Sequence, residues 1–515
     1  MAAILLLLHG CASLPPGSGT PKSPSGAFSH PEDTPLGRQF CRAAKEHAED
    51  SGFLLINTGF NGLLARLEIA RKARHTLDLQ YYIFRGDASG LRLADALLHA
   101  ADRGVRVRIL VDDGDTDARD DQLRILTAHP NIEFRVFNPF SYRGHSNALR
   151  AIEFAFNKPR LDYRMHNKLF VADNAVALIG GRNIGDAYFQ VDPLSQLGDD
   201  DLFTVGPMVK QLSVTFDDFW NSALAIPVNA LTNKRPSAAI LARFRKKLEE
   251  QRRSFNYAAR LSAGEPLEGI FSGRLRLIWA PAQLVYDSPE KRRVEKGELP
   301  GQLMQRTVNK ALRSVRHELL VMSPFFVPGE DGMAVFRVLR DRNVDIQILT
   351  NSLNSTHVLA AQAGYMHYRL ALLEEGARLF EIKATLGNSM GSGETRKMAG
   401  YGTYGLHGKM LVFDRKSVYI GSMNLDQRSE KLNTEIGLII DSPELANQVA
   451  RRFEELTGPE NAYRLLLRDE NGRPELIWQT REGGKIVNYD TEPALSEWRK
   501  FKVDLLSHLP LDGEL

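Results

Sequence analysis

Cysteine, net charge and long apolar segments are all scarce in this sequence of 515 residues. Its two cysteines, Cys11 and Cys41, are too few for a disulfide framework, so stability must come from a hydrophobic core. The formal net charge of +3, from 66 basic and 63 acidic residues, gives no broad basic field for nonspecific binding of nucleic acid. The apolar run from residue 1 to residue 11 is too short to cross a bilayer as a helix. A content of 43% hydrophobic and 25% charged residues is typical of globular domains.

The short apolar run at the start has the length of a signal-peptide core. Leu8 to Cys11 resembles the lipobox of bacterial lipoproteins, which implies that Cys11 is lipidated. Residues 12–36 are rich in Pro, Ser and Gly, which predicts a flexible tether. We therefore expect a lipid-anchored, membrane-associated envelope protein of a Gram-negative bacterium. The alternative is a disordered or helical N-terminus that is not processed.

One pattern of four residue types occurs twice with the same spacing. A lysine follows a histidine by two positions, an aspartate follows the lysine by five, and an asparagine follows the aspartate by ten. The residues are His166, Lys168, Asp173 and Asn183 in the first copy and His407, Lys409, Asp414 and Asn424 in the second. A single copy would fit an exposed strand face followed by a turn. Two copies indicate two half-sites that act together.

The local pattern also predicts the geometry of each copy. Residues two apart on a strand share a face, so each histidine and its lysine project together. Asp173 and Asp414 fall at hairpin turns, where we expect them to order the turn rather than to contact substrate, although the repeated pattern places them among the catalytic candidates. The return strand of each hairpin then brings Asn183 or Asn424 back to the level of the histidine.

These residue types suit the transfer of a phosphoryl group. An imidazole can attack phosphorus or protonate a leaving alcohol near neutral pH, and a lysine ammonium can neutralise phosphate oxygens. One histidine would become a phosphohistidine while the other acts first as an acid and then as a base. Neither copy has the clustered ligands of a metal site, and the two lysines already supply positive charge. We therefore predict a mechanism with no metal and no cofactor.

A histidine that attacks phosphorus works best when a carboxylate binds its other ring nitrogen. Glu435 and Asp201 each stand at the head of an apolar strand and are the predicted carboxylates. Asp199 and Asp200 leave the register of the second assignment ambiguous. The alternative is that these acids merely begin ordinary strands.

The order of predicted elements repeats along the chain. In the first half we expect a helix over 40–52, a second helix over 63–73, and then a strand, helix and strand over 76–84, 91–103 and 105–111, with a further strand over 132–137. The second half repeats the strand, helix and strand over 318–326, 333–340 and 344–350. His75 and His317 are 242 positions apart, and His166 and His407 are 241 apart. This near-constant offset indicates duplication of a whole unit.

The predicted fold class is therefore α/β, with two pseudo-symmetric halves and the active site at their interface. Residues 1–36 would be the signal and tether, 37–225 the first half with its motif at 160–187, 226–300 a connecting segment, and 301–515 the second half with its motif at 401–428. The charged helix expected over 231–260 would lie over the site, bridge the halves or form a solvated face. The glycine-rich stretch 384–405 is expected to form a long loop beside His407 that acts as a lid or binding loop.

The repeated pattern resembles the signature of the phospholipase D superfamily, over most of the chain beyond residue 36. Further segments resemble the C-type bacterial cardiolipin synthases: residues 137–140, 164–168, 180–189, 349–352, 363–365 and 433–435. The resemblance implies two phospholipase D-like halves and a phosphatidyltransferase that makes cardiolipin from glycerophospholipids. It also implies that His166 is the nucleophile, that His407 is the acid and base, and that Lys168, Lys409, Asn183 and Asn424 hold the phosphoryl oxygens.

Other functions remain open at this point. The same chemistry with water as acceptor would make a phospholipase D that produces phosphatidic acid. A nuclease or phosphodiesterase is disfavoured by the near-zero net charge, and a non-catalytic lipid-binding protein by the complete motifs. We expect membrane phospholipids as partners, phosphatidylglycerol above all and phosphatidylethanolamine as an alternative donor, together with a membrane surface and no nucleic acid. The sequence makes no prediction about protein partners.

Overall fold

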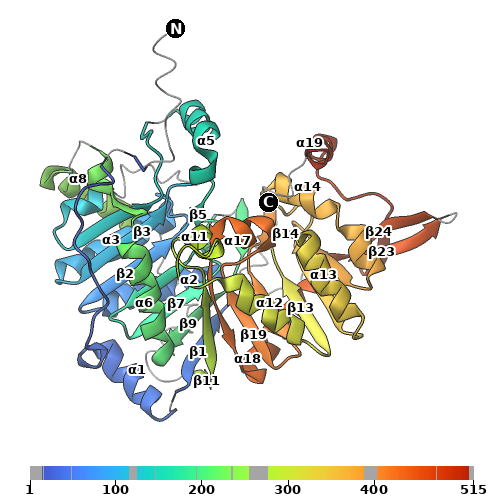
Figure 1. Ribbon diagram of the computed structural model, residues 1–515, viewed down its shortest axis with the longest axis horizontal. Coiled ribbons are helices and arrows are strands. Elements are labelled where there is room, and N and C mark those ends of the chain that lie inside the picture. Colours follow the sequence, from blue (N-terminus) through green and yellow to red (C-terminus); the bar gives the residue numbers. More distant parts are fainter. Residues whose placement is uncertain are drawn as a thin grey trace, which may run out of the picture.

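The computed structural model describes residues 14–15, 17–47, 49–114, 124–144, 146–192, 194–232, 236–254, 269, 276–387, 403–470 and 473–509. Within them the chain forms two large mixed sheets that stand side by side, with helices on the outside of each and between them (Figure 1). The lipobox-like residues 8–11, with Cys11, lie outside the described residues, as does the central part of the stretch 384–405.

The first sheet contains nine strands. Their spatial order is β10 (Ala225–Pro227), β4 (Ile132–Phe137), β3 (Arg106–Asp112), β2 (Thr76–Tyr81), β6 (Leu169–Ala172), β7 (Val176–Gly180), β9 (Asp201–Val205), β1 (Ser51–Ile56) and β11 (Ile278–Ala280). The second sheet contains ten. Their order is β12 (Ala282–Tyr286), β22 (Ile436–Ile440), β19 (Ser417–Gly421), β18 (Met410–Phe413), β13 (Glu318–Met322), β15 (Asp345–Asn351), β16 (Arg378–Ile382), β23 (Ala462–Glu470), β24 (Arg473–Glu482) and β25 (Lys485–Tyr489).

The two sheets have the same internal arrangement. The run β4-β3-β2-β6-β7-β9-β1 matches β16-β15-β13-β18-β19-β22-β12 strand by strand, with the same parallel and antiparallel pairings. In both, a parallel crossover carries the chain through a helix, which the predicted order of strand, helix and strand requires. The prediction of two pseudo-symmetric α/β halves is confirmed.

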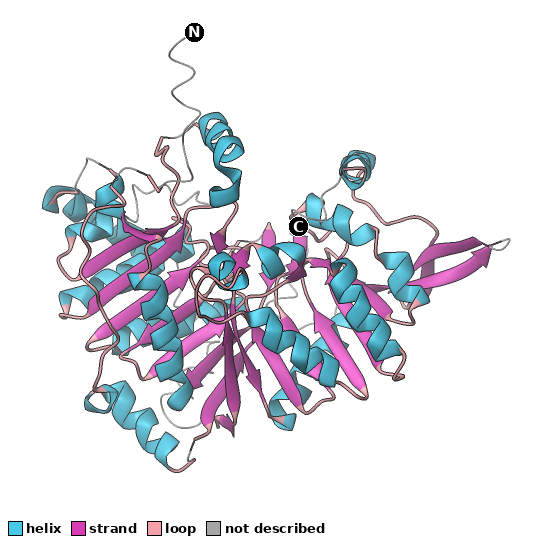
Figure 2. Cartoon of the chain, viewed as in Figure 1, coloured by secondary structure: helices cyan, strands magenta, loops and turns pink. Residues whose placement is uncertain are grey.

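Helices lie against the faces of both sheets (Figure 2). Apolar residues of α6 and α18 lie in one buried cluster that contains residues of both sheets, so the halves share a core. The helices are α1 (Pro35–Lys45), α2 (Gly59–Lys72), α3 (Ala88–Asp102), α5 (Asn147–Leu161), α6 (Pro207–Asn221), α7 (Val228–Leu231), α8 (Ala238–Ser254), α11 (Lys291–Glu295), α12 (Met304–Ser314), α13 (Gly329–Arg340), α14 (Leu359–Met366), α15 (Arg369–Glu374), α17 (Gln427–Lys431), α18 (Pro443–Thr457) and α19 (Glu497–Ser507), with short 3₁₀ helices at Pro31–Asp33 and Leu126–Ala128.

Two expectations need correction near the N-terminus. The helix predicted over 40–52 ends earlier, because α1 stops at Lys45 and Ser51 already begins β1, whose short apolar run pairs with β9.

The prediction of a free tether is wrong for residues 17–36. Lys22 donates to the carbonyl of Ala225 at 2.9 Å, and Arg108 donates to that of Ser25 at 2.9 Å, so this segment lies along the first half.

The segment predicted as a connection takes part in both halves. β10 and β11 belong to the first sheet, and β12 begins the second after a single intervening residue, Pro281. Helix α8 packs on α3, where Leu241, Phe244 and Leu248 join the core of the first half. The expected helix therefore covers the outside of the first half rather than the site. None of the helices in the described ranges is long and apolar enough to cross a membrane.

Candidate active site

The two motif histidines lie where the halves meet. His166 follows the short strand β5 (Arg164–Met165), which pairs in parallel with β21 (Asn433–Thr434) of the other half. His407 follows β17 (Thr403–Leu406), which pairs with β8 (Ser195–Gly198). The amide of His166 donates to the carbonyl of Thr434 at 2.9 Å, and that of His407 to the carbonyl of Gly198 at 2.7 Å. Each histidine backbone is thus held by the opposite half, just before strand β6 or β18 begins.

A buried carboxylate binds Nδ1 of each histidine. Both oxygens of Glu435 lie 2.9 Å from Nδ1 of His166, and Oδ2 of Asp199 lies 2.5 Å from Nδ1 of His407. Each carboxylate comes from the half opposite its histidine, because Glu435 belongs to the second half and Asp199 to the first. With Nδ1 as donor to a carboxylate, Nε2 is the ring nitrogen left to react.

The prediction of Asp201 as one of these carboxylates is wrong. Asp201 is buried in an ion-pair cluster, where it accepts two hydrogen bonds of 2.8 Å from Arg66 and one of 2.9 Å from Arg182. The carboxylate two residues earlier takes its place, because β8 ends at Gly198 and Asp199 lies at the crossing from β8 to β9. Three acidic residues stand in a row, and the strand register determines which of them faces His407. The sequence alone does not specify that register.

Both motif lysines are buried beside their histidines. Nζ of Lys168 donates to the carbonyl of His166 at 2.6 Å, and Nζ of Lys409 donates to the carbonyl of His407 and lies 3.2 Å from its Nδ1. Burial lowers the pKa of Lys168 well below its ordinary value and that of Lys409 to about 8. Two buried ammonium groups at the interface of the halves favour the binding of an anion.

The two predicted asparagines line the same cavity as the histidines. Oδ1 of Asn183 accepts a hydrogen bond from the amide of Ile83 at 3.2 Å. Oδ1 of Asn424 is buried and has no hydrogen-bond partner within the described part of the chain. The hairpins therefore bring both asparagines to the histidines, as predicted.

The two motif aspartates lie elsewhere, so their place among the catalytic candidates is wrong. Asp173 accepts from the amides of residues 74–76, and Asp414 from those of residues 316–318. Each stands at the end of β6 or β18 opposite the histidine, in a turn where Asp173, Asn174, Asp414 and Arg415 all have φ between 51° and 53°. Two successive positive φ values indicate type I′ hairpin turns. The aspartates order the hairpins, as their turn positions suggested.

The titration behaviour differs between the two half-sites. Burial and the neighbouring lysines lower the pKa of His166 well below its ordinary value and that of His407 to about 3, so both imidazoles are neutral at rest. Burial raises the pKa of Glu435 to about 7. Burial acts in the same direction on Asp199, but His407 and Lys409 outweigh it and hold its pKa below the ordinary range. Asp199 is the more firmly ionised carboxylate, and His407 the better placed to carry a positive charge.

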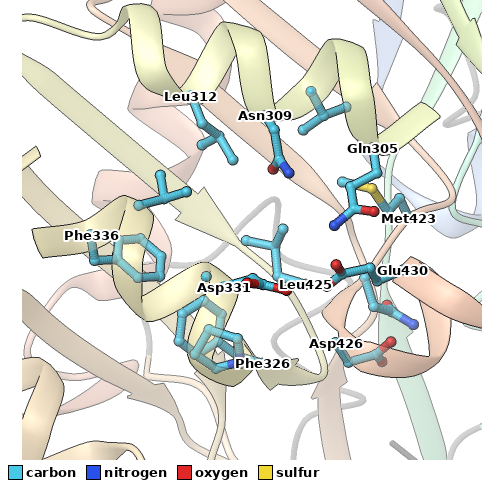
Figure 3. Close-up of a pocket in the computed structure, with 15 residues that line it drawn as sticks. Gln305, Asn309, Leu312, Phe326, Asp331, Phe336, Met423, Leu425, Asp426 and Glu430 are labelled. Carbon is cyan, nitrogen blue, oxygen red and sulfur yellow. The ribbon is translucent and has the colours of Figure 1, made fainter. Parts of the chain in front are cut away.

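One cavity of about 800 Å³ contains both histidines. Its walls come from both halves and combine polar groups with apolar ones such as Phe325, Val358 and Leu406. A smaller pocket of about 70 Å³ lies behind Asn424 and Asp426, between α12 and α13 (Figure 3). Its walls include Asn309, Leu312, Phe336 and Leu425. It contains neither motif histidine.

Several site residues were missed by sequence reasoning. The rings of Tyr82 and Tyr188 stand edge-on to His166 and His407, each with centroids 5.1 Å apart. Arg428 lines the cavity, and its Nη1 lies 2.7 Å from Oδ1 of Asp162 in the other half. Tyr82 lay in the strand predicted over 76–84, Tyr188 in the segment 180–189 and Arg428 at the end of the second motif, but none of them had been named as a site residue. No group of three or more possible metal ligands occurs among the described residues.

Comparison with known proteins agrees with this geometry. Residues 67–220 and 308–457 match the family model described as cardiolipin synthase, PLD-like domain. The chain is 36% identical over 469 residues to cardiolipin synthase C of Escherichia coli, which covers 91% of this chain and 97% of that protein. It is 26% identical over 424 residues to cardiolipin synthase A of Pseudomonas putida, covering 82% of this chain and 70% of the relative. The crystal structure of phosphatidylserine synthase from Haemophilus influenzae aligns with a TM-score of 0.52 at 13% identity, covering 83% and 92% of the two chains, and shares the fold.

Proposed function

The chain belongs to the cardiolipin synthase, PLD-like domain family, and from this premise we propose that it makes cardiolipin from glycerophospholipids through a phosphohistidine. It is a phospholipase D-type phosphatidyltransferase. One observation carries the two-step mechanism: two imidazoles face one cavity, each with Nδ1 bound to a carboxylate of the opposite half. The donor would be phosphatidylglycerol or phosphatidylethanolamine, and the acceptor a hydroxyl of phosphatidylglycerol.

In the first step Nε2 of His166 attacks phosphorus. The bond from phosphorus to the head-group oxygen breaks, and His407 gives its Nε2 proton to the departing alcohol. In the second step His407 removes the proton of the incoming hydroxyl, whose oxygen attacks phosphorus and releases His166. Charge is supplied by Lys168 and Lys409, while Asn183 and Asn424 hold phosphoryl oxygens.

His407 must be protonated to act as an acid, although it is neutral at rest. Its low pKa comes from burial and from Lys409, with Lys168 adding to the effect. A phosphodiester bound between the lysines brings a negative charge that opposes theirs, so substrate binding raises the pKa of His407. The ionised Asp199 then stabilises the imidazolium, which supports His407 as the acid and His166 as the nucleophile.

Transfer rather than hydrolysis is supported by the size of the cavity and by its apolar wall, which suit a lipid acceptor better than water. Lipid mass spectrometry of a bacterial host without cardiolipin, expressing this chain, tests the product. We expect cardiolipin to appear with the wild type and not with His166→Ala. Accumulation of phosphatidic acid without cardiolipin would identify a hydrolase instead.

Trapping tests the roles of the histidines. A phosphatidyl donor with a good leaving group and His407→Ala should leave a stable phosphatidyl label on His166. A label on His407 in His166→Ala, with none on His166 in the reciprocal variant, would reverse the assignment.

The lipid anchor at Cys11 completes the proposal, because it would hold the enzyme at the surface where its substrates lie.

A further inference from the structure

Helix α5 carries its apolar residues on the outside of the molecule. Between Asn147 and Pro159, which are themselves exposed, its exposed residues are 148, 149, 151, 152, 155 and 156, all of them Ala, Leu, Ile or Phe. Leu149 is 48% exposed, Ile152 52% and Phe156 80%. The spacing is that of one continuous helical stripe. A helix on the surface of a globular protein normally turns such a stripe towards the core.

The polar residues of α5 point the other way, towards the body of the protein. Glu153 accepts from the amides of residues 141 and 142 at 2.6 and 2.8 Å, and Arg150 donates to the carbonyl of Asp113 at 2.6 Å. Arg160, at the far end, donates to the carbonyl of Pro139 at 2.8 Å. The helix is thus fixed by its polar side, and its outward apolar stripe is a structural feature rather than a loose segment.

A second apolar stripe lies on α19, in the other half. Trp498 is 64% exposed, Phe501 54%, and Leu505 57%, and the two aromatic rings stack with centroids 5.4 Å apart. Nζ of Lys502 lies 5.8 Å from the Trp498 ring. Exposed tryptophan with lysine beside it is the composition of helices that lie at a membrane interface.

Both helices are attached to the walls of the active-site cavity. Asp162 caps α5 and pairs with Arg428, which lines the cavity. Helix α19 packs on α14, whose Ala361 lines the cavity on the other side. In Figure 1 α5 and α19 project from the same, upper edge of the molecule, and β5, the strand that precedes His166, lies directly below α5. Leu194, 67% exposed and next to the cavity-lining Ser195, adds an apolar residue at the rim.

We infer that α5 and α19 form a two-point docking surface for a phospholipid bilayer, with the entrance of the active site between them. This rests on the proposed function, since a membrane phospholipid is the substrate. A protein partner that bridged the two stripes would cover the entrance, whereas a bilayer that contacts both presents its head groups to the cavity. The apolar stripes would enter the head-group layer, and the lysine would remain at its polar boundary.

The test uses the full chain with Cys11→Ser throughout, so that no acyl anchor contributes. Ile152→Glu/Phe156→Glu changes the first stripe and Trp498→Glu/Phe501→Glu the second. The matched control is Val214→Glu/Ile486→Glu, because these residues are 58% and 65% exposed and lie outside α5 and α19. Binding is measured by sedimentation with vesicles of equal parts phosphatidylglycerol and phosphatidylethanolamine. Turnover is measured on those vesicles and on monomeric dihexanoyl phosphatidylglycerol, and light scattering gives the oligomeric state.

Each stripe variant should lose about tenfold or more in vesicle affinity and in turnover on vesicles, since each removes two large apolar contacts. Turnover on the monomeric lipid should stay unchanged, which also shows that the variants fold, and the control should match the parent. Unchanged vesicle binding in both stripe variants would overturn the docking surface. A dimeric parent that becomes monomeric in the variants, with vesicle binding retained, would assign the stripes to a second copy of the chain. Loss of vesicle binding without turnover of either lipid by any version would leave the docking surface standing and refute the proposed function.

Discussion

Replacing Asp199 by Asn should damage the chemistry while leaving the fold intact. The carboxylate lies 2.5 Å from Nδ1 of His407, and the substitution keeps its shape while removing its charge. The amide can also present its NH₂ group to Nδ1, which would move the imidazole proton to Nε2 and leave the ring in the wrong tautomer for its role as a base.

The size of the effect follows from the contact. A charge-assisted hydrogen bond to a buried imidazolium contributes ~1.5–3 kcal/mol, which corresponds to roughly 10- to 150-fold in rate. The wrong tautomer adds to this loss, so we expect kcat to fall about 10²- to 10⁴-fold with little change in KM. The neighbouring Asp201 provides a sharp comparison. Its carboxylate binds Arg66 and Arg182, and breaking a buried ion pair costs ~3–5 kcal/mol of stability, so Asp201→Asn should lower Tm while a folded sample keeps its kcat.

The assay compares two phosphatidyl donors, one with a natural head group and one with p-nitrophenol. Departure of p-nitrophenolate needs no general acid, so the release burst of Asp199→Asn should recover with that donor while turnover of the natural one stays slow. Equal losses with both donors would refute the assignment of His407 as the acid of the first step. An equal loss of kcat in Asp201→Asn would refute the distinction between the two aspartates.

Three further predictions concern pH, metal and the anchor. Burial lowers the pKa of Lys409 to about 8, so its ammonium is present below that pH, and kcat/KM should fall as the pH rises through about 8. The variant Lys409→Arg should move this fall in kcat/KM to higher pH. If the fall stays at the same pH, another group causes it. Activity should survive EDTA, since the two lysines supply the positive charge, and loss of turnover that one divalent ion restores would contradict this. Radiolabelled palmitate should enter the wild type but not Cys11→Ser, whereas equal labelling or equal fractionation of the two would dismiss the anchor.

The sequence predicted those parts of the fold that rest on local pattern and on repetition. Alternating apolar residues marked the inner strands, and the constant offset between the two motifs implied a duplicated unit. The strand β1 was missed because Ser51 to Ile56 is a short apolar run that periodicity cannot separate from a helix end. The segment 17–36 was misjudged for a different reason. Its partners, such as Arg108, lie about 80 positions away, and composition alone does not reveal them.

At the site, spacing identified the groups that react but not every group that supports them. His166 and His407 follow from the repeat, and Glu435 from its place at a strand head, where the structure puts it against His166. Asp199 could not be separated from its two acidic neighbours, because the choice depends on where one strand ends and the next begins. Tyr82 and Arg428 reach the cavity through the tertiary fold alone.

The exchange of carboxylates between the halves has a consequence for how such a chain could arise. Two identical subunits related by a twofold axis would exchange the same residue in both directions, so their two histidines would be equivalent. In this chain the two halves are joined covalently. Nδ1 of one histidine is bound by a glutamate and Nδ1 of the other by an aspartate. Fusion fixes the ratio of the halves at one to one and frees each copy to change separately. It thereby permits a division of labour that a symmetric dimer cannot express.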